Sequence, residues 1–229
     1  MKRKLGIVCD CIEDNDTLLN LEKIKSAGFD SFFSSEYSVS RALELKEKAV
    51  KLGLEYEFIH APFRLINSMW RDGDGYLEIY SGMKEAIDAA SAADVPAVIL
   101  HISSGWTPPE ISDIGLTRFD SLVEYAFQKG VIIAFENLRM IGNIAYFRDR
   151  YKDVATVRFC YDFGHEHAYT KTVSFPDIFT DKLYCTHIHD NLGRENERVG
   201  NPDLHLLPFE GTVDFKSIMK KLNSYSYSG

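Results

Sequence analysis

Side chains that could bind a metal are concentrated in residues 159–215. Three segments carry them, with the letters FCYDFGHEH, YCTHIHDN and NPDLHLLPFEGTVDF. Each side chain stands at the end of an apolar run or in the loop after it: Asp162, His165, His187, Asp203 and His205. Carboxylates and imidazoles that are held on rigid backbone but face outward suit a divalent-metal site. Metal binding is therefore the first chemistry that this stretch predicts.

All the histidines of the chain lie at a predicted strand end or in the loop after one, and none lies in a predicted helix. They are His60, His101, His165, His167, His187, His189 and His205. For a single histidine, such as His101 after the run AVIL, we favour a satisfied polar residue at a strand end. For the whole set together with Glu136 and Asp162, that alternative would leave buried charge uncompensated. We therefore favour a metal site for the set.

The elements that must position these residues can be read from hydrophobic periodicity. We expect strands at 5–9, 29–33, 54–59, 97–100, 131–135, 157–161 and 183–186. We expect helices between 16 and 28, at 40–52, 76–93, 117–128 and 144–151, within 174–182, and at 213–222. Alternation of helices with nearly continuous apolar strands predicts a parallel sheet. Because composition does not break along the chain, we predict one α/β domain over 1–229, a (β/α) TIM-type barrel, instead of a doubly wound sheet.

Two further features bear on this fold. No GxGxxG motif follows the first predicted strand, which weakens the dinucleotide-binding alternative. After Leu222 only the letters NSYSYSG remain, so we expect the eighth strand to be missing or truncated, whether or not it begins at 225–227. An open barrel, closure by a partner, or a shortened version of a longer chain would each account for this.

Composition narrows the classes of function. The 229 residues carry 34 acidic and 26 basic side chains, a net charge of −8, which makes nucleic acid an unlikely general partner. Cys9, Cys11, Cys160 and Cys185 follow no disulfide framework and are expected to be reduced thiols of a cytoplasmic protein, with metal contact at Cys9 and Cys11 the weaker alternative. No segment is apolar enough to predict a signal peptide or a membrane span.

The predicted strand ends should meet. In a barrel of parallel strands the carboxyl ends form one face, where active sites are found. Five strands end in such residues: His60, His101, Glu136, Asp162 and His187. Closure of the sheet would bring them together, and this convergence is the physical basis of the metal-site prediction.

At this point the sequence resembles the xylose isomerase-like barrels, a superfamily that includes sugar phosphate isomerases and epimerases and an apurinic-site endonuclease branch. The resemblance covers nearly the whole chain. It is carried by FIHAP at His60, VILHI at His101, AFENL at Glu136, YDFGH at Asp162, THIHDN at His187 and DLHLLPFEGTVDF from Asp203. No single motif is specific, but their order and spacing together are.

The resemblance implies roles for these residues. Glu136, Asp162 and His187 look like three of the four ligands of the family's catalytic metal. The fourth is a glutamate on strand eight, for which this chain has no position, and Glu210 matches a loop position instead. Five more residues match the ligands of two additional metals in the endonuclease branch: His60, His101, His165, Asp203 and His205. Related isomerases keep several of these residues to bind substrate.

Three further residues have open alternatives. Arg194 could clamp a carboxylate or phosphate, or be a solvated loop arginine. His189 would point away from His187 if the strand continued, as a packing residue or the neighbour of a ligand. Trp70 either stacks on a sugar or packs its own loop, and we favour packing.

The function that we expect is a divalent-metal-dependent isomerase or epimerase of a small-molecule sugar or sugar phosphate, with Mn or Zn favoured and Mg as an option. Glu136 is the candidate acid/base, moving a proton while the metal stabilises an enediolate. The alternatives are an endonuclease-like phosphodiesterase on abasic DNA and a non-catalytic sugar- or metal-binding relative. A barrel that lacks its last strand would expose apolar edges, which favours a homo-oligomer.

Overall fold

Strands and helices alternate along the chain, as the periodicity predicts. The computed structural model describes residues 3–12, 16–170, 172–194 and 203–227. It divides into two compact units, a first unit of Met1–Leu100 and Pro109–Ile133 and a second unit of His101–Pro108 and Ala134–Gly229. The strands follow the order of the chain across the sheet, β1-β2-β3-β4-β5-β6-β7. The fold is therefore α/β, as expected, while a single domain over 1–229 stays a prediction.

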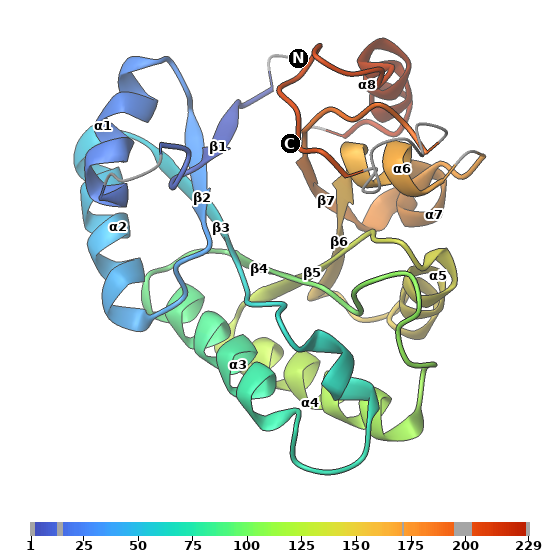
Figure 1. Ribbon diagram of the computed structural model, residues 1–229. Helices are drawn as coiled ribbons and strands as arrows, with labels where there is room; N and C mark the ends of the chain where they lie inside the picture. The colour runs from blue at the N-terminus through green and yellow to red at the C-terminus, as the bar shows by residue number, and fades with distance from the viewer. Residues whose placement is uncertain (1–2, 13–15, 171, 195–202, 228–229) are drawn as a thin grey trace. The chain divides into compact units, whose positions relative to one another are not determined.

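The first unit contains four parallel strands and the helices that connect them (Figure 1). Its elements are β1 (Gly6–Val8), α1 (Thr17–Ser26), β2 (Ser31–Ser34), α2 (Val39–Leu52), β3 (Glu55–His60), the 3-10 helix η1 (Ile66–Trp70), α3 (Leu77–Ala92), β4 (Ala97–Leu100) and α4 (Asp113–Lys129). The register pairs Ile7 with Phe32 and Ile59 with Val98.

Local sequence signals set the helix ends in this unit. The side chain of Asp16 accepts a hydrogen bond from the Leu18 amide (3.0 Å) and caps α1. Gly53 and Gly130 end α2 and α4 in the left-handed conformation, with φ of 63° and 70°. Glycine adopts this conformation at little cost, so both helices end at it.

The second unit contains most of the fifth strand and all of the sixth and seventh. Its elements are β5 (Ile132–Glu136, which begins in the first unit), α5 (Ile141–Arg150), β6 (Val157–Asp162), α6 (Phe163–Tyr169), α7 (Phe175–Phe179), the 3-10 helix η2 (Thr180–Lys182), β7 (Leu183–His187) and α8 (Phe215–Ser224). Strands β6 and β7 are parallel, and helices α5 to α8 lie around them (Figure 1). A short antiparallel bridge joins Asp190 to Leu206.

One prediction about this unit is wrong. His165 and His167 were expected in a loop, but they lie in α6. The helix forms because the Asp162 carboxylate accepts a hydrogen bond from the His165 amide (2.6 Å) directly after β6. Seven residues are too few for helical periodicity to be visible in the sequence.

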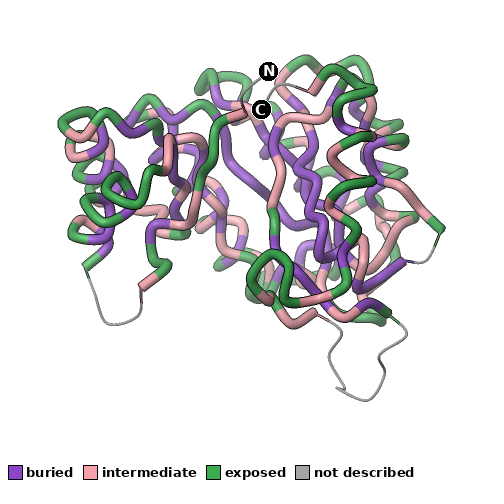
Figure 2. The backbone as a smooth tube through the Cα atoms, turned by 90° about the horizontal axis from the view of Figure 1, so that it is seen from above, coloured by how far each residue is buried: buried purple, intermediate pink, exposed green. Residues whose placement is uncertain are grey.

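Buried, half-buried and exposed segments alternate along the chain (Figure 2). Strands β4, β5 and β6 are buried along nearly their whole length, whereas β1 and β7 are not. In the second unit Phe159 stacks on Phe179, with ring centroids 4.8 Å apart, and Phe135 packs edge-on against Phe147. After α8, Tyr225 and Ser226 form a turn, and no eighth strand occurs among the described residues. Within those same residues, none of the helices combines the length and the apolar character that crossing a bilayer demands.

Candidate metal centre

Three predicted ligands come together at the carboxyl ends of strands in the second unit. Glu136 ends β5, Asp162 ends β6 and His187 ends β7. The parallel register pairs Asp162 with His187, and the His187 Nδ1 lies 3.8 Å from the Asp162 Oδ2 and 3.3 Å from the Glu136 Oε2. Both carboxylates are 2% exposed. The structure thus brings the expected Glu136, Asp162 and His187 together in a buried site.

Helix α6 adds an imidazole to this group. His165 Nδ1 lies 3.0 Å from Glu136 Oε1 and 3.0 Å from the carbonyl oxygen of Asn137. Its Nε2 lies 3.3 Å from Asp203 Oδ2, so His165 connects the strand ends with the segment that begins at Asp203. His101 approaches Glu136 from another loop, with Nε2 3.3 Å from Oε2. Both histidines are buried, as expected of residues in the site.

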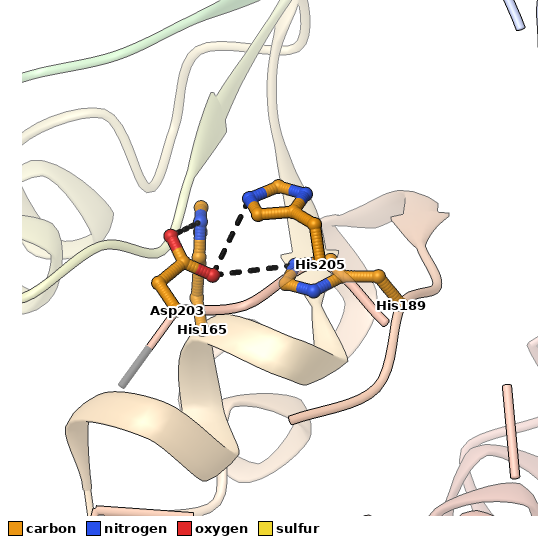
Figure 3. A group of neighbouring side chains, drawn as sticks. All are labelled: His165, His189, Asp203 and His205. Carbon is orange, nitrogen blue, oxygen red and sulfur yellow. Dashed lines mark ion pairs between the residues drawn. The ribbon is translucent and has the colours of Figure 1, made fainter. Parts of the chain in front are cut away.

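A second group forms around Asp203 (Figure 3). The rings of His189 and His205 are stacked, with centroids 3.9 Å apart and planes 3° from parallel. Asp203 Oδ1 lies 3.3 Å from His205 Nε2 and 4.0 Å from His189 Nε2. Tyr169 donates a hydrogen bond from its hydroxyl to Asp203 Oδ2 (2.6 Å). The structure thus places Asp203 and His205 beside His165.

His189 lies beside the predicted ligand Asp162, in line with one of the two alternatives that the sequence left open for it. Its ring was expected to point away from His187, but β7 ends at His187, so the alternation of a strand does not extend to it. His189 Nε2 lies 3.0 Å from Asp162 Oδ1, and its Nδ1 is buried without a hydrogen-bond partner among the described residues. Gly164 makes room for the ring, because a Cβ there would come 2.1 Å from His189 Cε1. A glycine after Asp162 was the sequence signal for this close approach.

Asp190 and Asn191 hold the Asp203 segment in place. The Asp190 carboxylate accepts hydrogen bonds from the backbone amides of Val213 (3.0 Å) and Phe209 (3.0 Å). Asn191 donates from its side-chain amide to the carbonyl oxygen of Gly164 (2.9 Å). These bonds fix the segment after β7 against α6 and thereby orient the second group.

The charges of the cluster shift the pKa values of its members. Burial alone would raise the pKa of Glu136, but His187, His101 and His165 lower it well below its usual value. Burial alone would lower the pKa of His165, but Asp162, Asp203 and Glu136 raise it well above its usual value. The two shifts favour an ion pair between the Glu136 carboxylate and the His165 imidazolium when no metal is bound. A cation bound at Glu136 would compete with the proton of His165.

The donor set fits a divalent cation. One oxygen or nitrogen from each member lies within 4.8 Å of the others in two groups, one of Glu136, Asp162 and His165, and one of His165, His189, Asp203 and His205. A third group joins Glu136 and His187 with the thiol of Cys160. Carboxylate oxygens and imidazole nitrogens are ligands that Zn²⁺ and Mn²⁺ accept. The buried Nδ1 of His189, which has no hydrogen-bond partner in the described part of the chain, is a further candidate donor.

Four other candidate residues have these contacts within their own units. His60 ends β3 in the first unit, where its Nδ1 lies 2.9 Å from the Ala61 carbonyl oxygen, and its place in the site stays a prediction. Arg194 donates from Nη1 to the carbonyl oxygen of Tyr169 (3.1 Å). Glu210 is exposed and accepts from the Leu207 amide, in line with a loop role. Trp70 is buried in the first unit against Phe119, so the packing alternative is confirmed.

Comparisons with known proteins identify the fold. The sequence profile of the family described as "Xylose isomerase-like TIM barrel" matches residues 21–229. The protein y4fM of Sinorhizobium fredii is 30% identical over 159 residues, which are 63% of this chain and only 49% of y4fM, so the match spans about half the length of that relative.

Two solved structures share the fold. A D-tagatose 3-epimerase-like protein has a TM-score of 0.79 and 23% identity, over 99% of this chain and 88% of that one. The 3-keto-D-glucoside 4-epimerase YcjR from E. coli has a TM-score of 0.75 and 18% identity, over 100% and 90%. At these identities the likeness shows a common architecture.

Proposed function

Because this chain belongs to the xylose isomerase-like TIM barrel family, we propose that it isomerises or epimerises a sugar at a divalent-metal site. The observation that supports this most strongly is the meeting of Glu136, Asp162 and His187 at three strand ends. The epimerase names of the two structures of similar fold favour a sugar substrate.

Glu136, Asp162 and His187 would hold the metal. When bound there, a divalent cation polarises a sugar carbonyl and the hydroxyl next to it. Two carboxylates and an imidazole leave positions open for such oxygens, which a catalytic metal site needs. His165 would keep Glu136 and Asp203 in place from the side, because it contacts both carboxylates.

Glu136 is the group that we assign to proton transfer. Its carboxylate is ionised and buried, so it can accept a proton from the carbon beside the carbonyl and return it. His101 and His165 approach its two oxygens and restrict its orientation. Isomerisation moves a proton along one face of the substrate, which one carboxylate can do. Epimerisation at one carbon needs a second acid on the opposite face.

The test is turnover of a panel of ketoses, aldoses and their phosphates by the metal-loaded protein. Glu136→Gln should lower kcat roughly 10²–10⁴-fold, the usual contribution of a general acid/base. Native mass spectrometry at saturating Mn²⁺ measures the metal content of that variant, so that turnover is compared between metal-loaded proteins. Glu85→Gln, an exposed residue of α3, is the matched control and should keep full turnover. Turnover in Glu136→Gln equal to that of the control would refute the assignment.

A phosphodiesterase acting on abasic DNA is the second candidate. It is favoured by the group of His165, His189, Asp203 and His205, which offers ligands beyond those of one metal. The net charge of −8 opposes it, because a DNA duplex is bound through a basic surface. Cleavage of an oligonucleotide with one abasic site would favour this candidate. Bound metal with no turnover of either substrate class would favour a non-catalytic sugar- or metal-binding protein.

A further inference from the structure

Two arginines lie over an exposed tryptophan beside the metal centre. The guanidinium carbons of Arg139 and Arg194 each lie 5.7 Å from the ring centroid of Trp106. Arg139 also lies 4.3 Å above the ring of Tyr169, against which Trp106 packs edge-on with centroids 5.4 Å apart. We call Trp106, Arg139, Tyr169 and Arg194 the arginine–aromatic cluster.

The positive charge of this cluster is not balanced by the described residues. No carboxylate among them lies within ion-pair distance of Arg139 or Arg194, whereas Arg41 pairs with several and Arg148 with Asp181. The Nε of Arg139 is buried and has no hydrogen-bond partner in the same part of the chain. Two guanidinium groups without a carboxylate partner in the described part of the chain are a typical site for a phosphate or a carboxylate.

Tyr169 links the cluster to the metal centre. Its hydroxyl donates to Asp203, its ring stacks on His165 with centroids 5.3 Å apart, and its other contacts are Arg139 and Trp106. Tyr169 therefore belongs to the cluster and also contacts Asp203 and His165 of the metal-binding group, so the two groups adjoin each other.

We propose that Arg139 and Arg194 bind an anionic group of the substrate, a phosphate or a carboxylate, at the end away from the reacting carbons. This rests on the proposed function and narrows its substrate to charged sugars. Trp106, 48% exposed, offers an apolar face for the sugar carbons between the two ends. A neutral sugar would offer neither guanidinium group an anion to bind.

Stacking of arginine on aromatic rings also stabilises loops without any ligand. The test must therefore separate recognition of an anion from packing. The measured quantity is the ratio of affinities for a charged and a neutral form of the same sugar, because a general packing defect lowers both.

Isothermal titration of the metal-loaded protein with ketopentose 5-phosphates, the neutral ketopentoses and ketouronates gives this ratio. We expect the best charged sugar to bind roughly 10–100-fold more tightly than its neutral parent, and Arg139→Gln or Arg194→Gln to lower that ratio about tenfold each. Arg150→Gln, an exposed arginine at the end of α5, is the matched control and should keep the ratio. Preference for the phosphate or for the uronate decides which anion is bound.

If an arginine variant does not fold, a competition experiment on the wild-type protein still tests the proposal. Inorganic phosphate should compete with the charged sugar but not with the neutral one. Equal affinity for both forms, or variants that weaken both equally, would overturn the proposal. Anion preference without turnover would contradict the proposed function alone, and turnover without anion preference would contradict this inference alone.

Discussion

The imidazole of His189 lies against Gly164, so closely that a Cβ on the glycine would come 2.1 Å from its Cε1. His189 follows β7 and Gly164 opens α6 after β6, so one close contact joins two strand–loop connections. The approach lets His189 Nε2 come 3.0 Å from Asp162. The absence of a side chain at 164 therefore lets His189 reach the candidate metal centre.

Gly164→Ala should damage the site although alanine ordinarily favours a helix. In a helix interior alanine is more favourable than glycine by about 1 kcal/mol. At position 164 the added carbon must displace His189, so we expect lower thermal stability and weaker binding of Mn²⁺ or Zn²⁺. We expect the metal affinity to fall roughly tenfold, the low end of the loss seen when the neighbour of a ligand is disturbed. Gly142→Ala in α5 is the matched control, because a Cβ there meets nothing within 4 Å. Identical melting temperatures and metal affinities of the two variants would contradict this reading.

Asp162→Asn should separate the role of Asp162 as the cap of α6 from its role as a metal ligand. Asparagine caps a helix about as well as aspartate, so α6 and the far-UV circular dichroism should persist. Removing the hydrogen-bond partner of a metal ligand weakens metal binding roughly 10–100-fold. Asp162 is assigned as a ligand itself, so the loss of its charge should weaken metal binding by more than that. Asp214→Asn, at the exposed cap of α8, is the control and should leave metal affinity as it is. A wild-type metal affinity in Asp162→Asn would remove Asp162 from the ligand set.

Asp190→Ala should loosen the segment that carries Asp203 and His205. The carboxylate accepts hydrogen bonds from the amides of Phe209 and Val213, and bonds to a charged group are worth about 1.5–3 kcal/mol each. We expect the free energy of unfolding in urea to fall by at least about 2 kcal/mol. Asp181→Ala, whose side chain is exposed, should change it far less. Equal losses in the two variants would show that Asp190 does not fix this segment.

The thiols should differ sharply in reactivity. Cys11 is exposed, whereas Cys9, Cys160 and Cys185 are buried. Burial raises the pKa of Cys9 to about 12, so at pH 8 its reactive thiolate is nearly absent in the folded protein. A chromogenic disulfide reagent should modify Cys11 alone in the native protein, and Cys11→Ser should abolish the signal. Rapid native modification of more than one thiol would contradict the burial of the others.

The same pKa shift predicts a dependence of stability on pH. The folded-state pKa of Cys9 lies above its ordinary value of 9.0, so its contribution to stability is complete below pH 9 and is lost as pH rises toward about 12. Cys9→Ala should therefore lose less stability than the wild type between pH 9 and 11. Parallel losses in the two proteins, measured by urea unfolding, would show that Cys9 titrates normally.

The strand ends could be predicted from the sequence, and the turns after them could not. Glu136, Asp162 and His187 each follow an apolar run, and parallel strands must present their carboxyl ends together. His189 depends instead on the residue at which β7 ends, a boundary that periodicity does not define. Helix α6 depends on one capping carboxylate, and its seven residues are too few to show a period. Arg139 contacts Trp106 and Tyr169, which are far from it in the sequence. No local pattern in the sequence predicts such contacts.

The most direct test of the account is to locate the ion. Crystals grown with Mn²⁺ should give an anomalous scattering peak bonded to Glu136, Asp162 and His187, and that peak should disappear in Asp162→Asn. A peak bonded to other residues, or no peak at saturating Mn²⁺ or Zn²⁺, would contradict the proposed metal centre.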